Sequence, residues 1–209
     1  MTTHYEFLAS LHEVLRPRRY LEIGVQTGAS MALASCLAVG VDPAGMSRHP
    51  RPNESIFTMT SDAFFADYRP ETPIDLVYID GMHLFEYALR DFLGALKYAN
   101  EKTVIVFDDV LPYNAAIAAR EQPPGDWTGD VWKIIPALED HCDSVAALVD
   151  VSPTGAFVLW DFDPDVLTYM TENYDAIVRD YMDRELPQWV LDREHVESAE
   201  SVLEDLRNR

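Results

Sequence analysis

Short runs of apolar residues alternate along this chain with longer stretches in which apolar residues recur every three to four positions. The first pattern is typical of buried strands and the second of amphipathic helices. Strands are predicted at residues 19–25, 39–42, 56–60, 75–80 and 103–108, and helices at residues 3–15, 28–38, 84–100 and 130–139, the last of them capped by Asp130. This alternation predicts a parallel sheet covered by helices on both faces.

The pattern changes in the last third of the chain. Residues 145–151 and 156–161 alternate around a Ser-Pro-Thr-Gly turn, which predicts an antiparallel hairpin. Residues 164–209 are acidic and helical, with a break at Pro187. We therefore predict an α/β fold: a Rossmann-like, doubly wound, mostly parallel seven-stranded sheet with an antiparallel hairpin at one edge and an acidic helical C-terminal tail.

The predicted elements form a single domain. Its parts are an N-terminal helix in residues 1–18, a Rossmann-like core in residues 19–162 and C-terminal helices in residues 163–209. A chain of 209 residues with 48% hydrophobic residues is long enough to bury a core without disulfides. Cys36 and Cys142 lack the spacing of metal ligands, so we expect small core residues in a reducing, cytoplasmic protein.

Charge narrows the range of partners. Asp and Glu total 36 against 16 Lys and Arg, which gives a net charge of −20. Such a surplus repels a phosphate backbone and an anionic membrane surface. Apolar runs also fall short of the ~20 residues that a membrane-spanning helix needs. We expect a protein that binds neither nucleic acids nor membranes.

The turn after the first predicted strand has the composition of a cofactor site. It reads Glu-Ile-Gly-Val-Gln-Thr-Gly, and Gly24 and Gly28 let the backbone approach a ligand closely. Asp42, twenty residues after Glu22, ends the second strand and can accept the hydrogen bonds of a ribose diol. Together they predict a nucleoside cofactor. Alternatively, Glu22 is a partly exposed strand residue and Asp42 a turn residue before Pro43.

The same turn distinguishes between two cofactors. A dinucleotide fingerprint needs a second glycine where this chain has Gln26, which argues against a nicotinamide oxidoreductase. S-adenosylmethionine has no phosphates, and Glu22 can hold its ammonium group, so S-adenosylmethionine is predicted. Ser61 and Asp62 follow the third strand, where they either contact the adenosyl group or cap a short helix.

Acidic residues end the fourth and fifth predicted strands. Asp80 ends one, and Asp108 and Asp109 end the next. The ends of neighbouring strands lie ~5 Å apart, so these carboxylates would repel one another and raise a pKa. A divalent cation removes that repulsion, and oxygen ligands without a cysteine suit Mg²⁺, Mn²⁺ or Ca²⁺ rather than a structural zinc. The alternative is that Asp80 and Asp108 cap the following segments while Asp109 faces water.

His83 follows Asp80 by three residues, where a near-neutral imidazole can act as a general base on a hydroxyl. The alternative is that His83 only begins the next helix. Residues 121–129 form a loop rich in Pro and Gly, in which Trp127 either covers the acceptor or anchors the loop. Tyr169, Tyr174 and Tyr181 lie on a tail stripe that fits a solvated face or a homodimer contact.

These motifs together resemble those of the class I S-adenosylmethionine-dependent methyltransferases. The turn at residues 22–28 resembles their first motif, and Asp42 resembles their ribose-binding acid. Residues 74–83, the pair Asp108-Asp109 and the sequence Gly-Asp-Val-Trp-Lys at 129–133 are similar to a metal-dependent O-methyltransferase group. That group includes the macrocin and mycinamicin sugar O-methyltransferases. The resemblance covers residues 20–160.

The resemblance implies a function and a set of site residues. Asp80, Asp108 and Asp109 would be the metal ligands, with Asp80 also at the cofactor, and His83 would be the base. The expected reaction is methyl transfer from S-adenosylmethionine to a hydroxyl of a sugar or oligosaccharide, as in polysaccharide biosynthesis. The alternatives are a catechol-like or other small-molecule O-methyltransferase and a noncatalytic S-adenosylmethionine-binding protein.

Overall fold

A seven-stranded sheet forms the centre of the protein, in the order β3-β2-β1-β4-β5-β7-β6. The computed structural model describes residues 2–163 and 165–209, so residue 164 of the predicted tail lies outside the described part. The strands are β1 (Arg19–Ile23), β2 (Leu37–Val41), β3 (Glu54–Phe57), β4 (Leu76–Ile79), β5 (Val104–Asp108), β6 (Val145–Val149) and β7 (Ala156–Trp160). β1 to β5 are parallel, and the β6–β7 hairpin pairs antiparallel with β5. The predicted fold class is confirmed.

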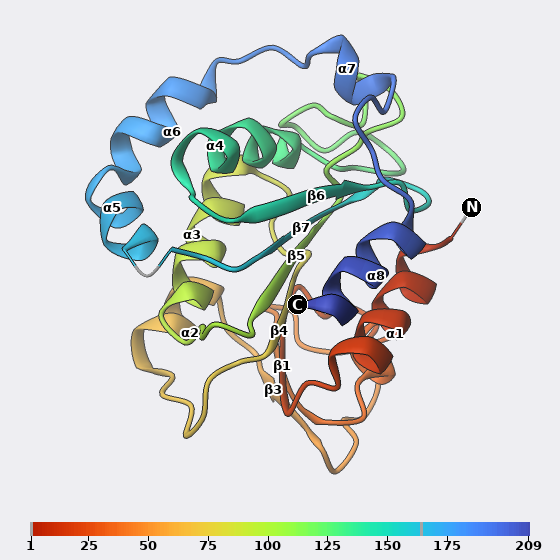
Figure 1. Ribbon diagram of the computed structural model, residues 1–209, viewed down its shortest axis with the longest axis vertical. Helices are drawn as coiled ribbons and strands as arrows, with labels where there is room; N and C mark the ends of the chain where they lie inside the picture. Colours follow the sequence, from red (N-terminus) through yellow and green to blue (C-terminus); the bar gives the residue numbers. More distant parts are fainter. Residues whose placement is uncertain (1, 164) are drawn as a thin grey trace.

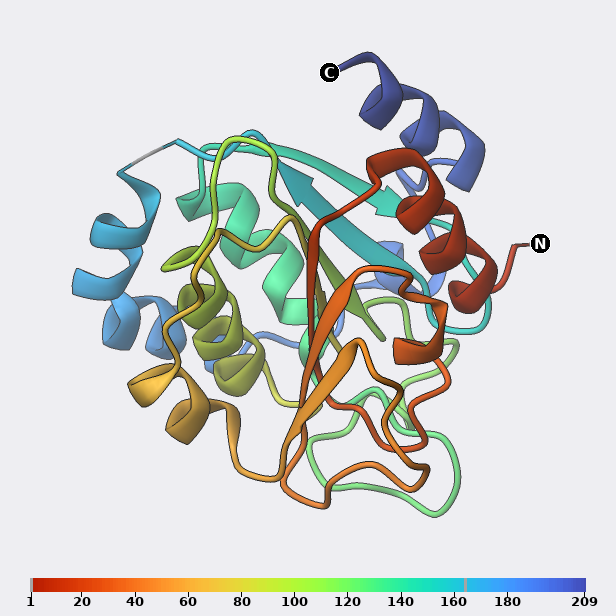
Figure 2. The ribbon, with the colours of Figure 1, turned by 90° about the horizontal axis from the view of Figure 1, so that it is seen from below.

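Helices cover both faces of the sheet (Figures 1 and 2). The helical elements are α1 (His4–Leu15), η1 (Met31–Leu33), α2 (Ser61–Asp67), α3 (Phe85–Leu96), η2 (Val131–Lys133), α4 (Ile134–His141), α5 (Val166–Glu172), α6 (Tyr174–Met182), α7 (Gln188–Leu191) and α8 (Ala199–Asn208). One core cluster joins α1, η1 and α8 to one face, and the other joins α2 to α7 to the opposite face. Both faces are therefore buried, which explains the continuous apolar runs of the strands.

The predicted helix at residues 28–38 is wrong. Only a short 3-10 turn, η1, forms there. The strand β2 begins at Leu37, inside the predicted range. Side chains from the following loop also bind carbonyl groups of this segment: the Arg48 guanidinium donates to the Gly28 carbonyl, and Arg51 donates to Met31 and Ala34. These bonds connect residues about 20 positions apart, beyond the reach of a local pattern.

Asp130 caps a different helix from the predicted one. Its side chain makes no capping hydrogen bond to the backbone of η2. Instead, Asp130 Oδ1 accepts a hydrogen bond of 2.9 Å from the amide of Phe85, the first residue of α3. The N-cap position of α3 is Leu84, which has no side-chain acceptor, so α3 obtains its cap from residue 130.

The predicted C-terminal tail divides between the two faces of the sheet. Ile177 and Tyr181 of α6 and Val190 of α7 join the core under α3 and α4. α8 crosses to the other face, where it packs beside α1 (Figure 1). Pro187 precedes α7 and marks the predicted break. Among the described residues, none of the helices has the length and apolar character needed to cross a bilayer.

Candidate active site

A cavity of about 700 Å³ opens at the carboxyl ends of the parallel strands. Its walls come from the turns after β1, β2, β4 and β5, the first residues of α1 and α2, part of the 121–129 loop, and the turn before β7. The strand order explains this position. From β1 the chain adds β2 and β3 on one side and β4 and β5 on the other, so the connections leave a crevice between β1 and β4.

The turn after β1 forms the first wall of this cavity. Gly24 has φ +87°, and a Cβ placed there would lie 1.9 Å from the carbonyl oxygen of Asp80, so only glycine fits. Asp42 holds the turn: its Oδ2 accepts from the amides of Val25 and Gln26 at 3.0 and 2.9 Å. Its Oδ1 accepts from the amide of Ala44 at 2.7 Å. Both Gly24 and Asp42 line the cavity.

Glu22 and Gly28 are not among the residues that line the cavity. The Glu22 side chain is fully buried, and its carboxylate accepts hydrogen bonds from Tyr20 Oη at 2.6 Å and Ser30 Oγ at 2.7 Å. Its strand neighbours Leu21 and Ile23 belong to the opposite core cluster, so Glu22 points toward the α1 face. Burial raises the pKa of Glu22 to about 7 despite these hydrogen bonds.

Ser61 and Asp62 both line the cavity, at the start of α2. The cap of α2 is neither of them, because Thr60 Oγ1 accepts the hydrogen bond from the Ala63 amide. Asp62 forms an ion pair of 3.1 Å with Arg90. The two residues thus line the crevice, and their role in cofactor binding stays a prediction.

Three side chains converge at the ends of β4 and β5. Asp80, His83 and Asp109 each offer one ligand atom, and these atoms lie within 4.8 Å of one another. His83 Nε2 is 3.2 Å from Asp80 Oδ1, and His83 Nδ1 is 3.3 Å from Asp109 Oδ2. We call these three residues the acid–histidine cluster.

Asp108 lies beside the acid–histidine cluster and also lines the cavity. Its carboxylate accepts from the hydroxyl of Tyr78 and, at 2.9 Å, from the amide of Asp109. Asp108 points to the same face of the sheet as Tyr78, because both occupy equivalent positions in the alternation of β4 and β5. Of the three predicted metal ligands, the structure brings Asp80 and Asp109 together with His83, while Asp108 is engaged by Tyr78.

Burial and neighbouring charges shift the pKa values of all three residues in the acid–histidine cluster. Burial raises the pKa of Asp80 and of Asp109, and the nearby Asp108 carboxylate raises both further. Burial alone would lower the pKa of His83, but its hydrogen bond to Asp80 and the charge of Asp109 raise it overall. Protonated His83 thus compensates part of the negative charge, a role that a divalent cation also fills.

Several cavity residues were missed by sequence reasoning. His4 and Tyr5 reach the cavity because Thr3 caps α1 and the His4 amide donates to the Ser152 carbonyl at 3.0 Å. No local signal marks this contact, which joins residues far apart in the chain. Asp91, 2% exposed on α3, also lines the cavity. An acid within the apolar stripe of the predicted 84–100 helix was a signal that could have found it.

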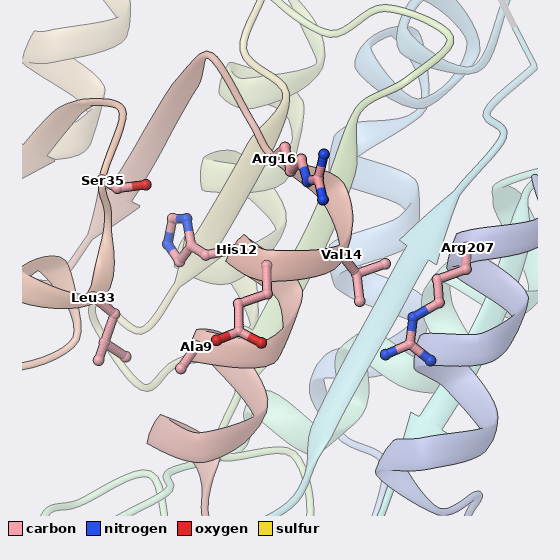
Figure 3. Close-up of a pocket in the computed structure, with 8 residues that line it drawn as sticks. Ala9, His12, Val14, Arg16, Leu33, Ser35 and Arg207 are labelled. Atoms are coloured by element: carbon pink, nitrogen blue, oxygen red, sulfur yellow. The ribbon is translucent and has the colours of Figure 1, made fainter.

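A second hollow, of about 840 Å³, crosses the outer face of α1 (Figure 3). It lies among Ala9, Arg16, Leu33, Ser35 and Arg207, away from the acid–histidine cluster. His12 packs edge-on against Tyr20 at 4.8 Å, and burial lowers its pKa to about 4. Both ring nitrogens of His12 are buried and have no hydrogen-bond partner among the described residues, so His12 contributes to packing here.

Much of this cavity is formed by a part of the chain that matches a known family model. The family model of a methyltransferase domain matches residues 21–110, which run from β1 past the end of β5. The matched segment is a little under half of the chain. The matched segment contains the β1 turn, Asp42 and the whole acid–histidine cluster. The predicted enzyme class, an S-adenosylmethionine-dependent methyltransferase, is confirmed at this level.

Several solved structures, O-methyltransferases among them, share the fold. Rv0187 from MTB, in a cofactor-bound structure, is 17% identical with a TM-score of 0.56 over 75% of this chain and 78% of its own. The O-methyltransferase from Bacillus cereus in complex with SAH is 14% identical, with a TM-score of 0.53 over 75% and 80%. TomG from Streptomyces achromogenes, an O-methyltransferase of tomaymycin synthesis in complex with SAM, is 17% identical, with a TM-score of 0.52 over 74% and 77%. None of the curated proteins matches this chain.

Proposed function

We propose that this protein transfers the methyl group of S-adenosylmethionine to a hydroxyl of a small molecule, with the help of a divalent cation. The observation that carries the proposal is the acid–histidine cluster, which shares one cavity with the turn at Gly24 and Asp42. S-adenosylmethionine supplies an electrophilic methyl group on a sulfonium. The chain supplies a closed backbone turn at one end of the cavity and charged ligands at the other.

The cofactor end is formed by the turns after β1, β2 and β3. Gly24 adds no side chain to this wall, and Asp42 fixes the backbone through three accepted hydrogen bonds. Ser61 and Asp62 stand on the far side, where they can accept hydrogen bonds from a nucleoside. A preorganised polar wall of this kind binds a ligand without the entropy cost of ordering a loop.

The proposed cation ligands are Asp80, His83 and Asp109. His83 thus replaces Asp108, which was the third ligand expected from the sequence. Two carboxylates and one imidazole suit Mn²⁺ as well as Mg²⁺, because imidazole favours transition metals while carboxylates accept both ions. A cation held there lowers the pKa of a bound hydroxyl. The general-base role of His83 stays a prediction of the sequence and is an alternative to its role as a ligand, because a ring nitrogen that binds the cation cannot also accept a proton.

The acceptor end of the cavity has aromatic and thioether walls. Tyr5 and Trp127 line it together with Met82, which is 49% exposed. Flat apolar walls beside charged ligands suit an aromatic diol, since the ring can stack while its hydroxyls face the cation. This favours a catechol-like acceptor. The O-methyltransferases among the similar structures, including one of tomaymycin synthesis, agree with a small-molecule acceptor. The sugar acceptor stays a prediction of the sequence.

The decisive test joins binding and turnover. Calorimetry with S-adenosylhomocysteine measures the cofactor site, and transfer of labelled methyl from S-adenosylmethionine to catechol and to a methyl mannoside, with Mn²⁺ or with EDTA, measures the reaction. We expect binding, transfer to catechol and loss of transfer in EDTA. Transfer to the mannoside alone would support the sugar acceptor. Binding without any transfer would support a noncatalytic binding protein, and absence of binding would refute the proposal.

A matched pair of variants isolates the cation site. Asp109→Asn keeps the size of the side chain but removes a charged ligand from the acid–histidine cluster, so we expect Mn²⁺ affinity to fall at least about tenfold while S-adenosylhomocysteine affinity stays unchanged. Asp143→Asn, at an exposed position before β6, is the control. Equal Mn²⁺ affinity in the two variants would exclude Asp109 as a ligand.

A further inference from the structure

Residues 127–130, Trp-Thr-Gly-Asp, lie against the turn that carries His83. The carbonyl oxygen of Trp127 is 2.6 Å from His83 Nδ1, and the Trp127 ring lies over the imidazole with centroids 5.3 Å apart. A Cβ on Gly129, which has φ +54°, would lie 1.6 Å from the His83 carbonyl oxygen. Two residues beyond His83, the Phe85 amide donates to Asp130 Oδ1. The segment thus contacts both the ring and the backbone around His83.

The Trp127 contact determines the arrangement of the imidazole. A carbonyl oxygen only accepts hydrogen bonds, so His83 Nδ1 carries a hydrogen and donates it. The neighbouring Asp109 Oδ2, 3.3 Å from the same nitrogen, is also an acceptor. The other nitrogen, Nε2, then points to Asp80 at 3.2 Å. In metal sites the hydrogen bond of one ring nitrogen sets which nitrogen is free to bind.

Segment 127–130 is itself firmly held. Asp130 is 2% exposed and forms ion pairs of 2.6 Å with Arg120 and 2.9 Å with Lys133. The amides of Thr128 and Gly129 both donate to the carbonyl of Ile117, at 2.9 and 3.0 Å. These anchors come from the loop after β5 and from η2, so the segment is held by contacts that do not involve His83.

We propose that segment 127–130 positions the side chain of His83: it directs Nε2 of the imidazole toward the cation site and holds the ring beside Asp80. The proposal rests on the proposed function, since it concerns the same cluster. Gly129 is the sensitive position, because any side chain there displaces the His83 backbone. Asp130 positions the segment through its charged partners, and neither residue touches the reacting atoms.

Two glycines of the same loop give a matched test. Gly129→Ala introduces the overlap with the His83 carbonyl, whereas Gly125→Ala, at φ +99°, has nothing within 4 Å of the added atom. Both changes place an alanine at positive φ, so Gly125→Ala controls for that backbone strain without the overlap. With Mn²⁺ as the probe in calorimetry, we expect Gly129→Ala to weaken binding by about 10- to 100-fold and Gly125→Ala to leave it within about twofold of the original protein. Equal Mn²⁺ affinities would overturn the proposal.

A measurement on the metal-free protein separates this inference from the proposed function. In protein with ¹⁵N-labelled histidine, the original chain and Gly125→Ala should show a slowly exchanging proton on His83 Nδ1, with the signal assigned by its loss in His83→Ala. Gly129→Ala should lose that protection. Failure of the original protein to bind Mn²⁺ would refute the cation site. Rapid exchange of the Nδ1 proton in the original protein would overturn the positioning role of segment 127–130, even if Gly129→Ala does not fold.

Discussion

Replacing Glu22 by glutamine tests which face of the sheet this carboxylate serves. Glu22 is fully buried among Tyr20 and Ser30, and its pKa rises from an ordinary 4.5 to about 7 because burial disfavours the charged form. Glutamine keeps the shape, and both neighbouring hydroxyls can rotate to donate or accept. The substitution therefore removes the charge while leaving the packing intact.

The magnitude follows from the pKa. Each tenfold change in proton affinity is worth about 1.4 kcal/mol, so ionised Glu22 costs the folded state about 3 kcal/mol. For an acid whose pKa is raised on folding, the contribution to stability is complete below pH 4.5 and is lost as the pH rises through about 7. We expect Glu22→Gln to gain about 2 to 3 kcal/mol on the original protein between about pH 5 and pH 8.

Urea unfolding at the two pH values measures this gain, with Glu121→Gln, at an exposed loop position, as the control. Because the gain is a difference between two pH values, a constant cost of altered hydrogen bonds cancels. A pH-independent difference would refute the reasoning. Calorimetry with S-adenosylhomocysteine gives a second readout: we expect unchanged affinity, since Glu22 does not line the cavity. A tenfold loss would instead support the ammonium contact expected from the sequence.

Three further outcomes are expected. Burial opposes the ionisation of Glu54, but hydrogen bonds from two arginines lower its pKa to about 2. Glu54→Gln should therefore lower the free energy of unfolding by about 2 kcal/mol near neutral pH. Urea titrations should show this loss of stability shrinking as the pH falls from 4.5 to 2. Gly24→Ala forces a Cβ to within 1.9 Å of the Asp80 carbonyl, so thermal unfolding should show a loss of several kcal/mol, and S-adenosylhomocysteine binding should weaken; native stability would exclude the close approach. Asp42→Ala removes the acceptor of three amide hydrogen bonds and should reduce S-adenosylhomocysteine affinity at least about tenfold, whereas unchanged calorimetric binding would exclude Asp42 from the cofactor wall.

The predictions that agree with the structure come from local patterns with strong physical causes. The runs at residues 75–80 and 103–108 became β4 and β5 because only a strand covered on both faces is apolar throughout. The predicted helix at 28–38 is replaced by a short 3-10 turn because β2 already begins at Leu37 and pairs with β1. A helix of this length is marginal by itself, so the tertiary pairing and the hydrogen bonds from Arg48 and Arg51 decide the local structure.

The amino-acid sequence alone determined the order of the elements, the acidic ends of β4 and β5, and the glycine turn after β1, since each depends on residues adjacent in the chain. Tertiary structure decided which of those acids face one another. Asp108 turns to Tyr78 because strand alternation places both on one face, and His83 joins Asp80 and Asp109 because Trp127, 44 residues later, holds its ring. Side-chain direction depends on contacts between distant segments, and only the folded chain brings those segments together.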